Sequence, residues 1–120
     1  MPGWGVKVAV ATEIRQMILN LFLAFVIATG YCNASCDKPP THPAYGITAS
    51  GTRTHEGTIA CPPEWDFGTK VFIPGEGRFV CEDRGGAIKG NRIDIYFPTC
   101  DEALEWGVQE KPVIVMEELF

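Results

Sequence analysis

Positive charge is scarce in this chain. Its 120 residues include 10 Lys and Arg against 15 Asp and Glu, for a formal net charge of −5 at pH 7. Because phosphate binding relies on clustered Lys and Arg, this balance argues against a nucleic-acid partner. The two histidines, His42 and His55, stand alone, and the sequence contains no internal repeat or low-complexity tract. The length fits one domain, which we expect to be monomeric.

Long apolar runs are also scarce, and residues 17–30 form the only one. This run is shorter than the roughly 20 residues that a membrane-spanning helix needs. Lys7 and Arg15 precede it, as in a signal peptide or a short membrane anchor. We therefore expect residues 1–28 to be a signal peptide or anchor and residues 29–120 to form the folded domain. Export to the periplasm, cell envelope or exterior follows, with or without membrane attachment through the apolar run.

Cysteine, in contrast, is abundant, with five residues at Cys32, Cys36, Cys61, Cys81 and Cys100. So high a count fits an exported, oxidised protein, and the odd number leaves one thiol free or paired between chains. Cys61 ends one expected strand and Cys81 lies in another, which favours a Cys61–Cys81 bridge. Cys100 then pairs with Cys32 or Cys36. The spacing of Cys32 and Cys36 also suits a structural zinc, although no second close Cys/His pair follows.

Short apolar segments separated by Gly and Pro indicate an all-β domain. We expect strands at residues 57–61, 69–73, 78–83, 92–97 and 111–116. Residues 74–77 read as a hairpin loop, and the Pro-rich residues 33–48 read as a longer loop. One helix is expected, since Thr99 can cap it, Glu102 can complete a capping box and Gly107 can end it.

The most informative stretch is the run from Asp83 to Phe97, in which two aspartates flank a glycine-rich turn. In a strand, Arg92, Asp94 and Tyr96 share one face, opposite the apolar Ile93, Ile95 and Phe97. We therefore expect Asp94 to project into a polar groove beside the core. Glycines in the turn allow close approach of a ligand to the backbone, in particular Gly85, Gly86 and Gly90.

This run, read as E-D-R-G-G-A-I-K-G-N-R-I-D-I-Y-F, resembles the three-aspartate (3D) domain family, a domain also found at the C-terminal end of membrane-bound lytic transglycosylase A. The ordered flanking matches extend the resemblance over residues 29–117: Ala49–Thr52, Ile59–Ala60, Gly68–Ile73 and Glu102–Gly107. The resemblance implies a small six-stranded double-psi β-barrel with one short helix, whose first strand includes residues 28–32. It also implies cleavage of the glycan strand of peptidoglycan, without metal or organic cofactor, by a bacterial or phage-encoded protein.

By this resemblance Asp94 is the acid/base of a lytic transglycosylase. A carboxylic acid serves that role when its pKa is raised towards neutrality. It protonates the bridging oxygen and then takes the proton of the sugar's 6-hydroxyl, leaving a 1,6-anhydro-MurNAc end. Asp83 would assist, because a neighbouring carboxylate raises the pKa of Asp94. The structural alternative is that the two aspartates cap turn amides or pair with Arg84 or Arg92.

The sequence departs from the family pattern where many members carry a third aspartate after the I-A segment. Pro62 stands at that position, and Glu64 or Asp66 could supply a carboxylate from a shifted one. This departure favours an alternative function, a non-catalytic module that binds wall glycan. A purely structural barrel is the other alternative.

Further residues are candidates for substrate binding. Lys89 and Arg92 could hold carboxylates of the wall polymer, or be solvated surface cations. Tyr96 could donate a hydrogen bond to a sugar, and Gly85 and Gly86 admit the ligand. Trp65 could stack on a sugar ring, although core packing is the commoner role of such an aromatic side chain.

Overall fold

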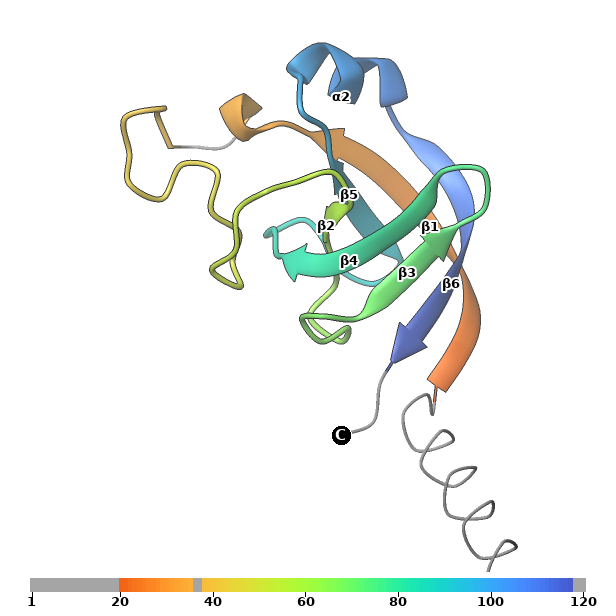
Figure 1. Cartoon of the computed structure of the whole chain (residues 1–120). Helices are drawn as coiled ribbons and strands as arrows, with labels where there is room; N and C mark the ends of the chain where they lie inside the picture. The colour runs from red at the N-terminus through yellow and green to blue at the C-terminus, as the bar shows by residue number, and fades with distance from the viewer. Residues whose placement is uncertain (1–19, 36–37, 118–120) are drawn as a thin grey trace, which may run out of the picture.

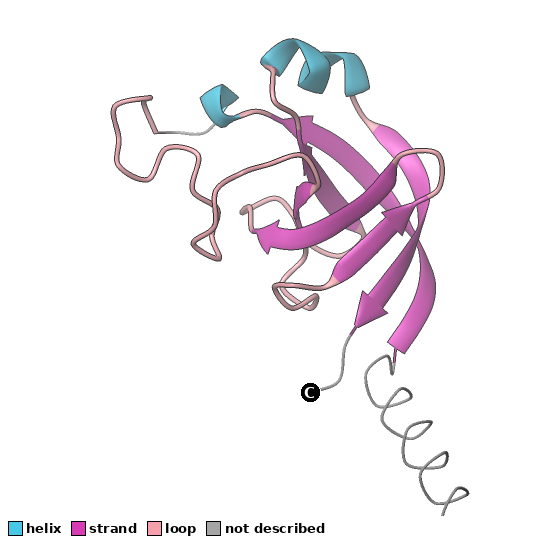
Figure 2. Ribbon diagram, viewed as in Figure 1, coloured by secondary structure: helices cyan, strands magenta, loops and turns pink. Residues whose placement is uncertain are grey.

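The computed structural model describes residues 20–35 and 38–117, which form a closed six-stranded barrel with the strand order β1-β5-β2-β4-β3-β6 (Figure 1). The strands are β1 Asn20–Tyr31, β2 Thr58–Ala60, β3 Lys70–Ile73, β4 Gly77–Asp83, β5 Arg92–Tyr96 and β6 Gln109–Glu117. Two pairs, β1–β5 and β2–β4, are parallel, and the others are antiparallel. A 3₁₀ turn, η1 (Asn33–Ser35), and one α-helix, α2 (Cys100–Trp106), complete the elements (Figure 2). The expected all-β class with one short α-helix is confirmed.

Side chains from every second strand residue point inward and fill the barrel. In β3, Val71 and Ile73 are buried while the residues between them are exposed, and the same alternation runs through β5 and β6. Every strand contributes to one cluster of buried side chains, made of Val26, Ala28, Ile59, Cys61, Val71, Ile73, Cys81, Ile93, Ile95, Val113 and Val115. Burial of each aliphatic side chain contributes about 1.5–3 kcal/mol, so this cluster is the main source of the barrel's stability.

The helix forms as its end residues predict. The Thr99 hydroxyl accepts a 3.2 Å hydrogen bond from the backbone N–H of Glu102. Gly107, at φ +65°, ends the helix and donates its N–H to the carbonyl of Ala103. Trp106 donates its indole N–H to the carbonyl of Ala28 at 3.0 Å, which ties α2 to β1.

The first strand begins earlier than expected. Residues 20–28 pair with β6 along their whole length, and Val26 and Ala28 lie in the core. The expected boundary before Thr29 therefore falls inside β1, and the barrel includes residues assigned to the leader or anchor. The outward side chains Leu21, Leu23 and Phe25 are all more than 60% exposed, so the strand is apolar on both faces and lacks the alternation that marks a strand. The part of the proposed leader before residue 20 lies outside the described residues.

Two disulfides staple the barrel. Cys61–Cys81 joins β2 to β4, as predicted, and Cys32–Cys100 joins the chain after β1 to the start of α2. Of the two partners expected for Cys100, the structure shows Cys32. Because Cys32 is in a disulfide, it cannot also be a zinc ligand. Cys36 lies outside the described residues. Among residues 20–35 and 38–117, no helix has the length and apolar character to cross a membrane.

Candidate functional site

A single row of residues crosses four neighbouring strands on the outer face of the barrel. Thr29 of β1 pairs with Asp94 of β5, and Asp94 pairs with Ala60 of β2. Ala60 also pairs with Asp83 of β4. The two aspartates therefore stand two strand spacings apart, or about 9–10 Å between Cα atoms. Ala60 is the residue that lies between them in this row, and it is buried, with 3% of its surface exposed.

A β-bulge brings Asp83 into this row. The β2–β4 register runs from Ile59 opposite Cys81 directly to Ala60 opposite Asp83, so Glu82 is the extra residue. Bulges of this kind redirect side chains and are common beside active sites. Without the bulge Glu82 would stand opposite Ala60. Glu82 instead accepts a hydrogen bond from Thr58 at 2.8 Å and lies 2.7 Å from the His55 ring nitrogen Nε2.

Asp94 is half-buried, and its surroundings favour the protonated form. Burial is the largest influence and raises the pKa of the Asp94 carboxyl; the Thr29 hydroxyl, which donates a 2.9 Å hydrogen bond to Oδ1, lowers it. The nearby charge of Asp83 raises the pKa and that of Arg92 lowers it, so the overall shift is upward. This upward direction of the pKa shift is the one that favours a general acid.

Neither neighbouring arginine forms an ion pair with the aspartates. The Arg84 guanidinium donates to the carbonyl of Trp65 at 2.7 Å and lies over the ring of Phe67, 4.1 Å from its centre. Among the described residues, no cationic side chain lies within 4.0 Å of either carboxylate. In this structure, therefore, neither Asp83 nor Asp94 pairs with Arg84 or Arg92.

Asp83 is held by three hydrogen bonds. Oδ2 accepts from the Tyr31 hydroxyl at 2.8 Å, and Oδ1 accepts from the backbone N–H groups of Ala49 and Arg84, each at 2.9 Å. Asp83 thus joins β1, β4 and the loop before β2, in keeping with the structural alternative for this residue. It also lines a hollow of about 430 Å³ beneath that loop, together with Lys38 and Thr48.

The remaining predicted binding residues are divided between the row and the surface. Tyr96 lies two residues beyond Asp94 on the same face of β5. Its ring packs edge-on against that of Tyr31, with ring centres 5.8 Å apart. Lys89, Gly85 and Gly86 are exposed in the loop between β4 and β5. Among the described residues, Lys89 forms no ion pair with Asp83 or Asp94, and its role in binding stays a prediction.

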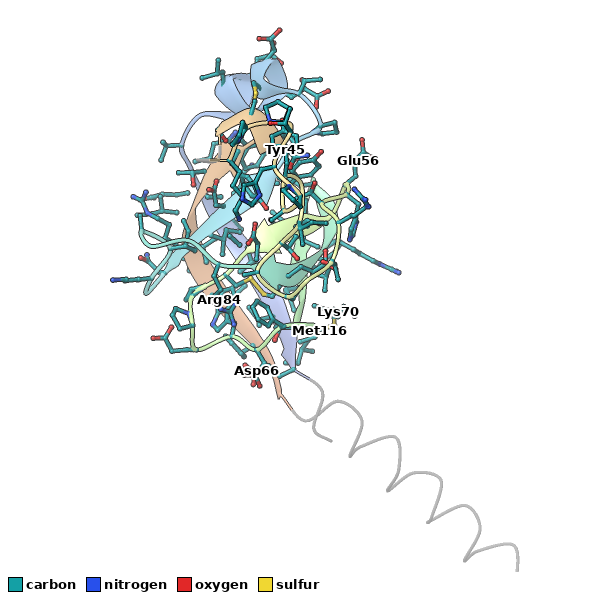
Figure 3. The ribbon with its side chains drawn as sticks, turned by 90° about the vertical axis from the view of Figure 1, so that its left-hand side faces the viewer. Tyr45, Glu56, Asp66, Lys70, Arg84 and Met116 are labelled. Atoms are coloured by element: carbon teal, nitrogen blue, oxygen red, sulfur yellow. A yellow bond between two sulfur atoms is a disulfide. The ribbon has the colours of Figure 1, made fainter. Side chains whose placement is uncertain are left out.

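The loop after β2 supplies no third acid to the row. Pro62 is buried, whereas Glu64 and Asp66 are exposed, and neither bonds to Asp83 or Asp94. Figure 3 shows Asp66 at the end of the barrel where Met116 lies, far from Tyr45 and Glu56. Trp65 packs against the core and edge-on to Phe22, with ring centres 6.4 Å apart. Trp65 therefore has a packing role in this structure, and its predicted stacking on a sugar ring stays a prediction.

Two site residues escaped the sequence analysis. Thr29 and Tyr31 of β1 each donate a hydroxyl hydrogen bond to one aspartate, Thr29 to Asp94 and Tyr31 to Asp83. The sequence signal for these two residues is their spacing. Two residues apart in a strand, Thr29 and Tyr31 place both hydroxyl groups on the same face.

These features place the chain in the class of small closed β-barrel domains, with two carboxyl groups in one row across neighbouring strands. The chain belongs to the 3D domain family, whose model matches residues 57–117. It is 38% identical over 76 residues to the cell wall-binding protein YocH of Bacillus subtilis, covering 59% of this chain and 26% of YocH. It is 35% identical over 82 residues to the putative cell wall shaping protein YabE of the same organism, covering 68% of this chain and 20% of YabE.

The fold is also similar to the crystal structure of MltA from E. coli. The TM-score is 0.52 at 24% identity, and the match covers 68% of this chain and 30% of MltA. This likeness, with the six closed strands, confirms the double-psi β-barrel. The chain spans less than a third of the length of each of these relatives.

Proposed function

We propose that this protein acts on the glycan strands of peptidoglycan as a lytic transglycosylase, with Asp94 as its acid/base. The names of the two Bacillus relatives support a role at the cell wall. The observation that carries the proposal is the state of Asp94, a half-buried carboxyl group with a raised pKa and, among the described residues, no cationic side chain within 4.0 Å. The two disulfides fit the export that such a role requires.

The proposed reaction needs one carboxyl group. Protonated Asp94 donates its proton to the oxygen between MurNAc and GlcNAc as the bond from that oxygen to the MurNAc C1 breaks. The Asp94 carboxylate then takes the proton of the MurNAc 6-hydroxyl, whose oxygen bonds to C1. A 1,6-anhydro-MurNAc end forms, GlcNAc leaves with a free hydroxyl group, and Asp94 is protonated again.

Asp83 assists by its charge in this proposal. Its carboxylate raises the pKa of Asp94 across the methyl group of Ala60, and the same charge stabilises positive charge that develops on the sugar ring. Its three hydrogen bonds hold it in place without a counter-ion. Arg92 and Tyr96, which flank Asp94 on the same strand face, are the proposed contacts for the polymer on either side.

A wall-binding module without catalysis is the second candidate. Pro62 stands where many family members carry an aspartate, and the Asp83 oxygens already accept hydrogen bonds from the protein itself. The same row of residues would then hold glycan strands without breaking them.

Mass spectrometry of treated peptidoglycan separates the two functions. Purified protein incubated with peptidoglycan should release muropeptides with 1,6-anhydro ends, and Asp94→Asn should release none. Asp101→Asn, an exposed aspartate on α2, is the matched control and should keep activity. Sedimentation with peptidoglycan but no released product would favour the binding module, and reducing ends would reject the transglycosylase chemistry.

A further inference from the structure

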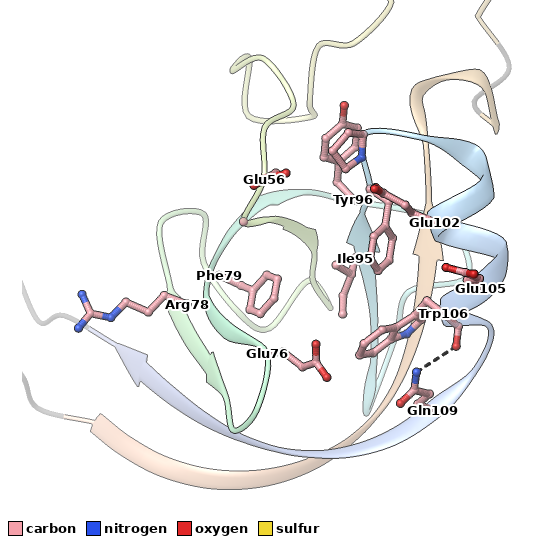
Figure 4. A pocket seen from close by; sticks show the side chains of 13 residues that line it. Glu56, Glu76, Arg78, Phe79, Ile95, Tyr96, Glu102, Glu105, Trp106 and Gln109 are labelled. Carbon is pink, nitrogen blue, oxygen red and sulfur yellow. Dashed lines mark hydrogen bonds between the residues drawn. The ribbon is translucent and has the colours of Figure 1, made fainter.

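A second hollow, separate from the aspartate row, lies between the β3–β4 hairpin, the end of β5 and α2 (Figure 4). Its volume is about 770 Å³, within the range of small-molecule sites in proteins. Tyr96 lines the hollow and packs edge-on against Tyr31, whose hydroxyl bonds to Asp83. This aromatic pair therefore lies between the hollow and the Asp83 carboxylate. Neither Asp83 nor Asp94 lines it.

Aromatic rings form much of its wall. Phe79 projects from β4, Tyr96 from β5 and Trp106 from α2, three elements that are distant in sequence. Trp106 is held from behind by its hydrogen bond to Ala28 and by the ring of Phe97, with centres 5.8 Å apart. Rings fixed in this way present faces that attract cations.

The charges around the hollow are mainly negative. Four glutamates line it, namely Glu56, Glu76, Glu102 and Glu105. The lining cation is Arg78, whose guanidinium extends away from the glutamates in Figure 4. Among the described residues, no Lys or Arg pairs with Glu56, Glu102 or Glu105.

The protein already holds an ammonium group in this setting. Lys111 places its Nζ 3.7 Å from Oε1 of Glu76 and 5.4 Å from the centre of the Trp106 ring. One carboxylate and one aromatic face thus bind the end of an alkyl chain at the border of the hollow. The remaining rings and carboxylates of the hollow offer the same chemistry, and within the described part of the chain none of them has a Lys or Arg partner.

We propose that this hollow binds a primary alkylammonium group, such as the end of a lysine-like side chain or of a free diamine. The ammonium lies between Glu102 and Glu105 of α2, which are three residues apart and share one helix face. The alkyl chain packs on the rings of Phe79 and Tyr96. Asp94 takes no part in this site, although Tyr96 is also one of the proposed polymer contacts beside Asp94.

Titration of the full-length protein followed by amide NMR tests the proposal. The probes are Nα-acetyl-lysine amide and 1,5-diaminopentane, and Nα-acetyl-norleucine amide supplies the same chain without the ammonium. We expect the first two to cause saturable shifts in α2 and the β3–β4 hairpin and the third to cause none. A response to the diamine alone would assign the site to free amines rather than to side chains, within the same proposal.

Charge-matched variants show whether the hollow itself is responsible. Glu102→Gln with Glu105→Gln should weaken binding by about threefold to tenfold, the scale of two partly exposed ion pairs. Glu64→Gln with Asp66→Asn removes the same charge outside the hollow and should leave the dissociation constant unchanged. Equal weakening by both doubles, no saturable shift by either amine, or equal binding of the norleucine amide would overturn the proposal. Cleavage by Asp94 is measured separately, so failure here leaves it intact.

Discussion

The hydroxyl of Thr29 donates a 2.9 Å hydrogen bond to Oδ1 of Asp94 across the parallel pairing of β1 and β5. This contact joins two residues 65 positions apart and lowers the pKa of Asp94, opposing the larger effect of burial. The Thr29 hydroxyl therefore orients the Asp94 carboxyl group and limits the upward shift of its pKa. Tyr31 has the corresponding contact with Asp83.

Replacing Thr29 by Val should move the pH dependence of glycan cleavage. Loss of the hydrogen bond raises the pKa of Asp94 further, so the acid stays protonated to higher pH and the alkaline limb of the rate moves upward. Rates measured across pH would show this, and Thr29→Ser, which keeps the hydroxyl group, should restore the original limb. An unchanged limb in Thr29→Val would mean that the hydroxyl does not act on the titrating group.

Replacing Asp94 by Asn should stabilise the barrel at neutral pH. Because the pKa of Asp94 is higher in the folded than in the unfolded chain, the wild-type protein loses stability as pH rises from the unfolded to the folded pKa. The neutral amide avoids that loss, and we expect a gain of about 0.5–2 kcal/mol, the size common for single stabilising substitutions. Urea unfolding should show the gain at pH 7 and a smaller one below pH 3.8, where both states are protonated. Destabilisation at pH 7 alone would contradict the raised pKa.

Replacing Tyr31 by Phe should destabilise the protein. The change removes the hydroxyl donor to Asp83 and leaves a partly buried carboxylate oxygen without that partner, at a cost of about 1–3 kcal/mol. Thermal or urea unfolding measures the effect. Tyr45→Phe, in the loop before β2, is the control and should change stability little; equal losses would show that the Asp83 contact is not responsible.

Removing either disulfide should lower stability, in a predictable order. The Cys32–Cys100 bridge closes a separation of 68 residues and Cys61–Cys81 one of 20, which correspond to about 4 and about 3 kcal/mol of chain entropy. Unfolding of the two double Ala variants under identical conditions compares them. A larger loss from the shorter bridge would indicate that packing of the buried Cys61 and Cys81, rather than loop closure, sets the effect.

Shortening the chain should identify the start of the barrel. A protein that begins at Asn20 retains every described strand, whereas one that begins at Thr29 loses the β1–β6 pairing and the core side chains of Val26 and Ala28. We expect the first to give cooperative unfolding and the second to remain unfolded by circular dichroism. If the protein that begins at Thr29 folds, the result would support the domain boundary expected from the sequence.

Local signals in the sequence predicted much of the fold. The capping threonine, the ending glycine and the hairpin loop at 74–77 are short-range features, and each lies where it was expected. The N-terminal half of β1 could not be predicted as a strand, because its buried face and its exposed face are both apolar. Such a continuous apolar run also matches a leader peptide.

The acidic site was predictable only in part. Asp83 and Asp94 stand out within one motif, but their neighbours Thr29, Tyr31 and Ala60 come from other strands, and only the folded register brings them together. The bulge at Glu82 has no clear local signature, yet it decides that Asp83 rather than Glu82 faces Ala60. The packing of Trp65 on Phe22 is likewise a long-range contact.

The most direct test of the central claim is a ¹³C NMR titration of the Asp94 side-chain carboxyl group, assigned by its absence in Asp94→Asn. The proposed acid requires a midpoint above 3.8, the ordinary value for an aspartate, in the folded protein. A midpoint at or below 3.8 would contradict the account, because the folded protein would then not favour the protonated form of Asp94 that donates the proton to the glycosidic oxygen.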